Sequence, residues 1–478
     1  MATDMVQEIR LRTSIVLLAL VVGISCIISI SSLGGCGGGG GNITHENPGP
    51  GGPGQVPDEE IPIEVPADSW GQLPLVRIMA EGELKPKIRA VFDSGGNVHI
   101  SCLHASGIDG EYQLSCLSWN WKNFLNPAGQ ELEPVAGIDN CQVPAFTLTR
   151  DNCPVLAYRG GTLRGCSGEE PLLESDAIIS LREKGAWSSW TGAEGVAEKD
   201  SSVGLAGTEV SIVTDSKGYI HLSYQLLSES CRDKSVSADL YYLKKHRSSL
   251  GSGVLAERVE EEDRNGERHF LGAHCSIILD RAENPVIFHF AEFSDRTKGL
   301  RVARKRSDGT WRSEWIEQGC EAGCISCARD VKTGYIGVAY QVKSYTPDSG
   351  RDDIYCLRYA VADEQFSTWE LMMVDDSVRC GDYCSLAFDS QGCPAIAYYE
   401  IQNLDPPYPL KNLKFAYLKN GSWNTEVIAS QGDIGLYNSL WLDKDNRAFI
   451  CSCSTTDETV YLFYRDLAHR YDSGESSE

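Results

Sequence analysis

The sequence predicts an all-β protein built from repeats of one four-stranded antiparallel unit, and three observations support this. A hairpin pattern, in which apolar and polar residues alternate on both sides of an Asp-, Gly- or Asn-rich turn, recurs seven times along the chain. A third alternating segment follows each hairpin, and a short Trp-containing fourth segment often follows that. The turns repeat every ~58 residues, a period typical of β-propellers.

The hairpins are the clearest part of each repeat. They cover 88–103, 144–159, 210–225, 275–290, 325–341, 384–399 and 438–453. Their turns carry Asp93, Asp215, Asp280, Asp330, Asp389 and Asp443, with Thr149 in the second repeat. An Asp at the start of a tight turn accepts backbone N–H groups, so we interpret these acids as structural. Calcium binding at Asp443, Asp445 and Asn446 is the alternative.

The third strands are expected at 112–119, 176–183, 238–245, 298–305, 353–360, 412–419 and 459–466, and fourth strands at sites such as 307–317 and 419–428. Four antiparallel strands make one propeller blade. A serine recurs four residues before the turn acid, at Ser211, Ser276, Ser326, Ser385 and Ser439. We interpret it as a small packing residue on the crowded innermost strand.

The last repeat ends before its fourth strand, and a matching segment precedes the first hairpin. Residues 69–78 resemble the fourth strand that begins at Ser422. We therefore predict that this N-terminal strand (about 69–78) completes the last blade and closes a seven-bladed ring over 69–468. Pro74 fits an outermost strand, whose free edge does not need its missing N–H. An open solenoid is the alternative.

Residues 1–35 predict an export signal. Arg10 and Arg12 precede an apolar run over 15–30, which is shorter than the ~20 residues of a membrane span. The segment Leu33–Cys36 resembles the bacterial lipobox, and this resemblance implies that Cys36 is lipidated and becomes the first mature residue. An uncleaved signal anchor is the alternative.

The segments at either end of the ring complete the expected domain organisation. Residues 36–68 are Gly- and Pro-rich and predict a flexible tether, and 469–478 predict an acidic, disordered tail. The expected location is the cell envelope, with the protein lipid-anchored and facing outside the cytoplasm. Gly37 after Cys36 implies sorting to the outer membrane if the source is Gram-negative.

Net charge limits the classes of ligand that the protein can bind, and cysteine content indicates its compartment. The 43 Lys and Arg against 67 Asp and Glu give a net charge of −24, which argues against nucleic acid and anionic lipid surfaces as ligands. The 18 cysteines suggest an oxidising compartment. We predict disulfides, although their connectivity cannot be deduced from spacing. Cys102 and Cys116 fall on neighbouring strands and could pair, Cys141 and Cys153 flank one hairpin, and the cluster Cys320, Cys324, Cys380 and Cys384 suggests blade-to-blade links.

The spacing of Cys320, Cys324 and Cys327 resembles the iron–sulfur motif of radical-SAM enzymes. Export, a position on a propeller strand and the absence of an α/β barrel pattern oppose that interpretation, and Cys380 and Cys384 repeat the spacing in the next blade. We predict no metal and no cofactor, with zinc as a lesser alternative.

The hairpins and their following turns resemble bacterial propellers with BNR or Asp-box repeats, a group that includes sialidases and propeller lectins. Ser307, Asp308, Gly309 and Trp311 form a shortened Asp box, and Gly421–Trp423 a weaker one. The resemblance implies a sialidase-superfamily-like propeller. It implies no catalytic residue, because no arginine motif precedes the first blade; Arg77 is the nearest candidate.

Candidate ligand-binding residues lie where the fourth-to-first and second-to-third strand loops are expected. They are His274, Tyr383, Tyr437, Glu292 and Glu400, with Gln225 and Gln341. Aromatic rings beside carboxylates suit sugars. The alternative is that the tyrosines pack between blades and the acids are merely solvated.

No catalytic motif of the Ser-His-Asp, zinc-protease, P-loop or dinucleotide type is present. The first functional hypothesis is therefore a membrane-anchored module that binds a glycan or an envelope protein, or a scaffold without a small ligand. The alternative is a glycoside hydrolase or polysaccharide lyase with its site at the channel mouth.

Overall fold

The computed structural model describes residues 65–467, with gaps at 79–86, 94, 106–111, 121–131, 139–143, 161–162, 166–170, 174, 194–201, 231–235, 252–255, 261–268, 345–353, 378 and 403–409. The predicted signal, lipid site at Cys36, most of the tether and the acidic tail lie outside these residues. Residues 59–478 form one compact unit, to which all of the described residues belong.

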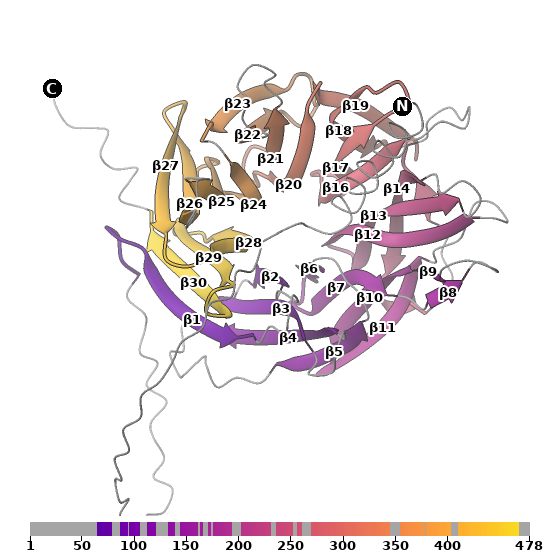
Figure 1. Cartoon of the computed structure of the whole chain (residues 1–478), viewed down its shortest axis with the longest axis horizontal. Coiled ribbons are helices and arrows are strands. Elements are labelled where there is room, and N and C mark those ends of the chain that lie inside the picture. Colours follow the sequence, from indigo (N-terminus) through magenta and orange to yellow (C-terminus); the bar gives the residue numbers. More distant parts are fainter. Residues whose placement is uncertain are drawn as a thin grey trace, which may run out of the picture. The chain divides into compact units, whose positions relative to one another are not determined.

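The described chain is almost entirely β-strand, as predicted, and its strands are antiparallel neighbours in groups of four (Figure 1). The first three groups are β2 (Lys87–Phe92), β3 (Asn97–Ala105), β4 (Tyr112–Asn120) and β5 (Glu133–Ile138); β6 (Ala145–Leu148), β7 (Pro154–Gly160), β10 (Asp176–Glu183) and β11 (Ala186–Ala193); and β12 (Ser202–Thr214), β13 (Tyr219–Ser230), β14 (Val236–His246) and β15 (Glu257–Arg258).

The next three groups follow in chain order. They are β16 (Phe270–Leu279), β17 (Pro285–Glu292), β18 (Lys298–Lys305) and β19 (Trp311–Gln318); β20 (Glu321–Arg329), β21 (Ile336–Ser344), β22 (Ile354–Ala362) and β23 (Glu370–Asp375); and β24 (Cys380–Phe388), β25 (Pro394–Gln402), β26 (Leu410–Lys419) and β27 (Ser422–Ala429). A parallel bridge between Ala238 and Phe270 joins the third group to the fourth. A short hairpin, β8 (Leu163–Gly165) with β9 (Pro171–Leu173), and a 3-10 turn over Arg247–Ser249 lie outside the groups.

The last group joins the two ends of the described chain. It consists of β28 (Ile434–Leu442), β29 (Arg447–Ser454), β30 (Thr459–Asp466) and, on the outside, β1 (Gly71–Arg77). β1 pairs antiparallel with β30, and Leu75 of β1 is fully buried. The predicted closure by the N-terminal strand is confirmed. Pro74 lies on this outermost strand, whose outer edge has no neighbour among the described strands, so the missing N–H of the proline can face that edge at little cost.

The innermost strands are β2, β6, β12, β16, β20, β24 and β28. Among the described residues each contacts the next, and β28 contacts β2, so the sequence of neighbours closes on itself (Figure 1). The fold of four-stranded antiparallel sheets is therefore confirmed. The count of seven blades stays a prediction, with which this arrangement of the described strands agrees.

The recurring serines connect neighbouring innermost strands, a role that goes beyond the predicted packing. Each hydroxyl accepts a backbone N–H of the next strand around the ring at 2.9–3.4 Å. The pairs are Ser211 with Ile277, Ser276 with Cys327, Ser326 with Leu386, Ser385 with Leu440, and Ser439 with Ala90. These hydrogen bonds satisfy backbone donors that no ladder partner can reach.

The turn acids have the predicted structural role. Asp93 Oδ1, for example, accepts the backbone N–H groups of Gly95 and Asn97, both at 2.8 Å. At the turn proposed for calcium, the cationic side chain of Arg447 already pairs with Asp443 and Asp445. No group of three potential metal ligands occurs within the described ranges.

The disulfide prediction is wrong for the cysteines that the structure describes. All 13 of them, Cys102, Cys116, Cys320, Cys324, Cys380 and Cys384 included, are free thiols. Cys102 lies opposite Ser115 and Cys116 opposite Ser101, so the two cysteine side chains project from opposite faces of the sheet. The thiol of Cys384 donates to the carbonyl oxygen of Cys324 rather than meeting its sulfur. Cys141 lies outside the described residues.

Candidate functional site

The first part of the site is a set of bulges near the start of the innermost strands. The register of β16, β20, β24 and β28 against the second strand of each group shifts there. The same position in each bulge has a left-handed backbone, at His274 (φ 53°), Cys324 (φ 47°), Tyr383 (φ 51°) and Tyr437 (φ 56°). Non-glycine residues rarely adopt this conformation, and bulges that re-aim a side chain are common beside functional sites.

A glycine two residues earlier makes room for three of these bulges. Gly272, Gly381 and Gly435 all have positive φ, and a Cβ on Gly272 would lie 3.2 Å from the backbone of Leu240. Gly207 has the same place on β12, two residues before Glu209. The pattern Gly-x-residue therefore marks Glu209, His274, Tyr383 and Tyr437 as equivalent positions on different strands.

Arg89 on β2 is the one charged residue in the serine series. It lies four residues before the turn acid Asp93, where five of the other innermost strands have Ser211, Ser276, Ser326, Ser385 and Ser439. Its guanidinium interacts electrostatically with Glu209, Cys324, Cys384 and Tyr437, which belong to four other strand groups. A side chain can reach four other groups in this way only if it projects toward the centre of the ring. Burial lowers the pKa of Arg89.

Two carboxyl groups share this central region with His274. Glu209 interacts with His274 and with the cationic side chains of Lys87, Arg89 and Arg159, yet burial raises its pKa. Asp382 interacts with His274 and Arg379 and is hydrogen-bonded to Gln341 and Cys324, and burial raises its pKa as well. Both side chains keep part of their surface accessible. A carboxyl group with a raised pKa holds its proton closer to neutral pH, as a general acid requires.

Tyr383 and Tyr437 form an aromatic pair beside these carboxyls. Their ring centroids are 4.6 Å apart with an interplanar angle of 59°, and Tyr399 lies 6.0 Å from Tyr383. Burial raises the pKa of Tyr383 well above its ordinary value. Gly323 lies beside His274, since a Cβ at this position would be in van der Waals contact with the imidazole, 3.7 Å from its Nε2.

Three of the five predicted ligand-binding residues belong to this channel cluster, which we define as Arg89, Glu209, His274, Asp382, Tyr383 and Tyr437. Glu400 is instead buried in a separate network, where Nζ of Lys414 lies 3.0 Å from Oε1 of Glu400 and 2.5 Å from Oδ2 of Asp375. Glu292 pairs with Arg296 at 3.4 Å. These partners of the two acids lie outside the cluster.

The two predicted glutamines are structural links between strand groups. Nε2 of Gln225 donates to the carbonyl oxygen of Leu271 at 2.9 Å, and Nε2 of Gln341 donates to that of Cys380 at 3.1 Å. Gln341 also holds Asp382, so it positions one member of the cluster.

Sequence reasoning missed Arg89, Glu209 and Asp382. Two features of the sequence distinguish these three residues. Arg89 breaks the serine series, and Glu209 and Asp382 lie at or beside the residue that follows the recurring glycine by two positions.

Comparisons with known proteins returned fold-level similarity alone. No protein-family model and no curated protein matches the chain. Among solved structures, a Hadza microbial sialidase is 12% identical, covers 77% of this chain and 76% of its own, and has a TM-score of 0.45. An ulvan lyase is 12% identical over 73% of this chain and 79% of its own, with a TM-score of 0.43.

A third similar structure is the Penicillium chrysogenum α-L-arabinanase, at 9% identity over 83% of this chain and 99% of its own, with a TM-score of 0.44. At these identities the conclusion on function has to come from the channel cluster. Within the described residues, no helix is long and apolar enough to cross a membrane.

Proposed function

We propose that this protein is a polysaccharide-active enzyme whose site is the channel cluster. The observation that carries the proposal is the convergence of Glu209, His274 and Asp382 with Arg89 from separate innermost strands. Titratable groups that converge from separate strands, with pKa values shifted by burial as at Glu209 and Asp382, are typical of active sites. The ion pair of Arg465 with Glu426, in contrast, joins β30 to β27, away from the innermost strands.

The substrate class follows from the charges and rings of the cluster. Arg89, with Lys87 and Arg159 close to Glu209, suits an acidic sugar, because a guanidinium binds a carboxylate or sulfate strongly. The Tyr383–Tyr437 pair offers an aromatic surface for the C–H face of a sugar ring. Asp382, which keeps its proton more readily than an exposed Asp, acts as the general acid.

Hydrolase and lyase chemistry make different demands on this cluster. A hydrolase uses Asp382 as acid and Glu209 as the second carboxyl group. A lyase uses Arg89 to neutralise a uronate carboxylate, while Tyr437 or His274 abstracts the adjacent proton. In both cases the acid Asp382 protonates the departing glycosidic oxygen.

The test is a screen of the purified protein against acidic and neutral polysaccharides. New reducing ends without ultraviolet absorbance identify a hydrolase, and reducing ends with the absorbance of an unsaturated uronate identify a lyase. Both activities should disappear in Arg89→Gln and persist in Arg77→Gln, which alters an exposed arginine of β1. Turnover that persists undiminished in Arg89→Gln contradicts the proposal.

The second candidate is a glycan-binding or envelope-protein-binding module without turnover. The aromatic pair Tyr383–Tyr437 favours it, since stacking alone is sufficient for binding a sugar. A glycan array or pull-down that finds a ligand, together with no product in the screen, supports this candidate.

For location, we propose lipid attachment at Cys36 and an extracytoplasmic position of the ring, on the strength of the segment Leu33–Cys36 and the Gly- and Pro-rich residues after it. Incorporation of a labelled fatty acid by the wild-type chain, with loss in Cys36→Ala, is the expected result. Equal labelling of the two chains argues against it.

A further inference from the structure

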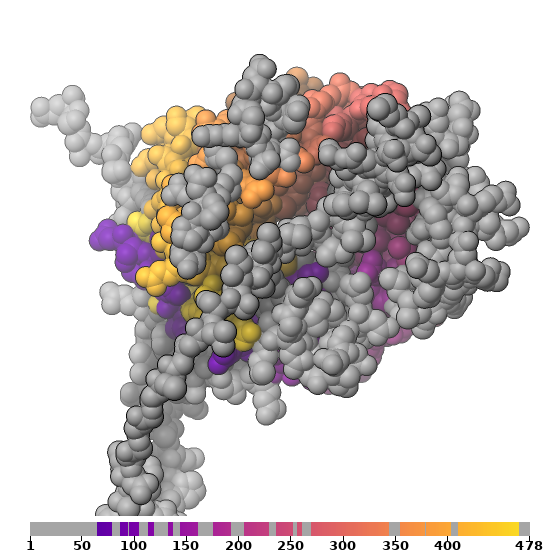
Figure 2. Space-filling view, viewed as in Figure 1, coloured from indigo at the N-terminus to yellow at the C-terminus, as the bar shows by residue number. Residues whose placement is uncertain are grey.

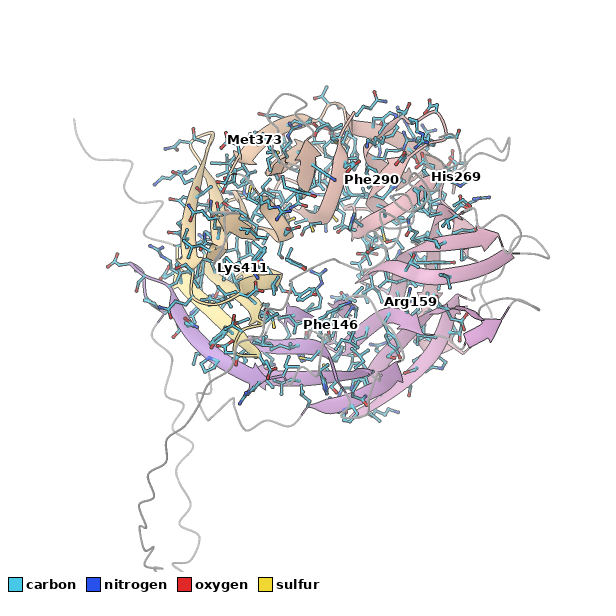
Figure 3. All side chains as sticks on the ribbon, in the orientation of Figure 1. Phe146, Arg159, His269, Phe290, Met373 and Lys411 are labelled. Carbon is cyan, nitrogen blue, oxygen red and sulfur yellow. The ribbon has the colours of Figure 1, made fainter. Side chains whose placement is uncertain are left out.

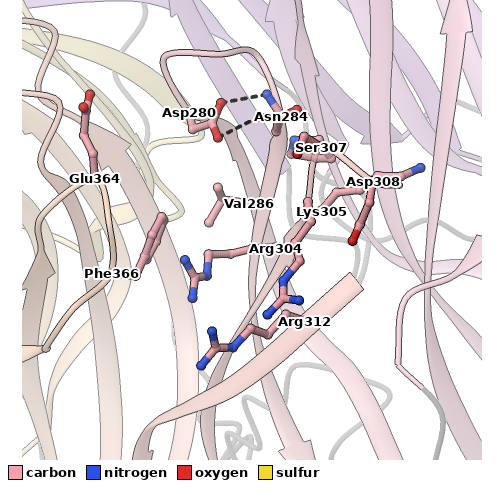
Figure 4. A pocket seen from close by; sticks show the side chains of 12 residues that line it. Asp280, Asn284, Val286, Arg304, Lys305, Ser307, Asp308, Arg312, Glu364 and Phe366 are labelled. Carbon is pink, nitrogen blue, oxygen red and sulfur yellow. Dashed lines mark hydrogen bonds between the residues drawn. The ribbon is translucent and has the colours of Figure 1, made fainter. Parts of the chain in front are cut away.

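A cavity with a cationic wall lies at the turns of the fourth strand group. Its volume is about 350 Å³, and its lining includes Arg304, Lys305, Arg306 and Arg312 (Figure 4). The cavity is formed beside the turns that join β16 to β17 and β18 to β19, and Phe366 of the next group contributes to it. A space of this size accommodates a small ligand.

The cavity is separate from the channel cluster. In an antiparallel group, the turn after the first strand and the turn after the third strand lie on one face, and the loops after the second strand lie on the other. His274 is near the start of β16, whereas Asp280 of the cavity follows its far end. The two sites therefore lie at opposite ends of the strands.

Arginines directly face one another in the cavity wall. Arg304 on β18 and Arg312 on β19 are register partners, and like charges in that relation repel (Figure 4). Figure 3 shows the described side chains over the whole ribbon. One carboxylate, Glu314, serves both of them, at 3.1 Å from Arg304 and 3.7 Å from Arg312. Burial lowers the pKa of Arg304; the charge of Glu314 opposes this shift, and the charges of Arg312 and Arg306 add to it.

The acidic side chains that line the cavity accept hydrogen bonds from residues other than Arg304 and Arg312 or pair with another arginine. Asp280 accepts the backbone N–H and side-chain amide of Asn284, and Asp308 accepts the backbone N–H and hydroxyl of Thr310. Glu364 pairs with Nε of Arg281 at 2.6 Å. None of these three acids pairs with Arg304 or Arg312, whose carboxylate partner is Glu314.

The stacking of Arg304 fixes its position. The guanidinium lies 4.1 Å from the ring centroid of Phe366, and its Nε has no hydrogen-bond partner among the described residues. Arg312 has 55% of its side chain exposed, so it can turn toward a ligand. Arg304, with a fixed guanidinium, and Arg312, with a flexible one, could together bind an oxyanion through charged hydrogen bonds.

We propose that this cavity is a second site, which binds an oxyanion of the sulfate or phosphate type, either free or as a substituent of a sugar. An anion between Arg304 and Arg312 would add a second counter-charge where the single carboxylate of Glu314 now serves both guanidinium groups. The proposal is independent of the proposed function, because it involves no residue of the channel cluster.

The experiment measures the affinity of inorganic sulfate for the full chain by calorimetry, with sodium chloride of equal ionic strength as the reference. The wild type should bind sulfate. Arg312→Gln should weaken binding about tenfold or more, because it removes a charged hydrogen bond. Glu314→Gln should strengthen binding, since it removes the competing carboxylate. Arg296→Gln, on an exposed arginine of the same strand group, should bind like the wild type.

Two outcomes overturn the proposal: no sulfate binding by the wild type beyond the chloride reference, or equal affinity in Arg312→Gln. Thermal unfolding of each variant shows that it is folded. A competition with dextran sulfate, against dextran as control, then separates the sources. Tighter binding of dextran sulfate than of sulfate, lost in Arg312→Gln, assigns the site to a sulfated glycan, and competition by sulfate alone assigns it to a free anion.

Discussion

The hydroxyl of Ser439 on β28 accepts the backbone N–H of Ala90 on β2 at 3.0 Å, across the seam where the last strand group meets the first. The two residues are 349 positions apart in the chain, so this hydrogen bond ties its ends together. Four other serines make the same bond between consecutive groups, which shows the seam to be an ordinary member of the series. Figure 2 shows the indigo first strands directly beside the yellow last ones.

Ser439→Ala should lower the free energy of unfolding by about 1–3 kcal/mol, because the buried N–H of Ala90 loses its acceptor. Chemical denaturation measures this. The matched control is Ser422→Ala, on an exposed serine of β27, which should change stability little. Equal stability of the two variants would show that the seam bond is dispensable.

Leu75→Ala should cost about 2–5 kcal/mol, the usual range for a fully buried leucine. Leu75 lies on β1, and β1 completes the last group through β30. Leu371→Ala, which truncates a half-exposed leucine on another outermost strand, β23, is the control and should cost far less. A small effect at Leu75 would indicate that the ring is stable without β1.

Lys414→Met should cost about 3–5 kcal/mol, because it leaves Asp375 and Glu400 as buried acids without their shared cation. Burial raises the pKa of Asp375, but hydrogen bonds from Lys414, Ser377 and Tyr398 outweigh it and hold the pKa below 3.8. That contribution is present above pH 3.8 and is lost as the pH falls through the lowered pKa.

The difference between Lys414→Met and the wild type should therefore shrink in acid, which denaturation curves over a pH series would reveal. Lys444→Met, at an exposed ion pair with Asp445, should leave stability nearly unchanged. A cost at Lys414 that is independent of acid pH would contradict the assignment.

Asp382→Asn should stabilise the protein at neutral pH by about 0.5–2 kcal/mol while it abolishes activity, a common trade-off at functional sites. Burial raises the pKa of Asp382, so the folded state binds a proton that the unfolded state releases. Wild-type stability then falls as the pH rises above 3.8, and the variant lacks this fall.

The gain should accordingly be larger at pH 7 than near pH 3.8, as measured by thermal unfolding. Asp308→Asn removes an acid whose hydrogen bonds from Thr310 lower its pKa, so it should show no gain. A gain at Asp382 that grows toward acid pH would have the wrong sign.

The repeat made the fold predictable from the sequence. The alternation around Asp93 or Asp443 indicates each hairpin, and the fourth-strand pattern over 69–78 indicates that β1 completes the group of β30. The disulfide prediction was wrong because a bridge between neighbouring strands needs two cysteines on the same face of the sheet. The hairpin pattern does not give the register that puts Cys102 and Cys116 on opposite faces.

The site was predictable only in part. His274, Tyr383 and Tyr437 could be selected because aromatic and basic side chains before a hairpin are conspicuous, and their role in ligand binding stays a prediction. Glu400 was misplaced because its burial depends on Lys414 from β26 and Asp375 from β23, contacts that alternation cannot show. Arg89 was missed because it belongs to no known motif. It is distinguished only by being an arginine at a position where most other innermost strands have a serine.

The most direct test of the central claim, that the channel cluster is the functional site, is the turnover or binding of the screened glycan by Arg89→Gln. The substitution should reduce catalytic efficiency or affinity about 100-fold or more, since it removes the central cation of a preorganised site. Thermal unfolding should confirm that the variant is folded, and Arg77→Gln should match the wild type. A folded Arg89→Gln protein with the wild-type rate and affinity would contradict the claim.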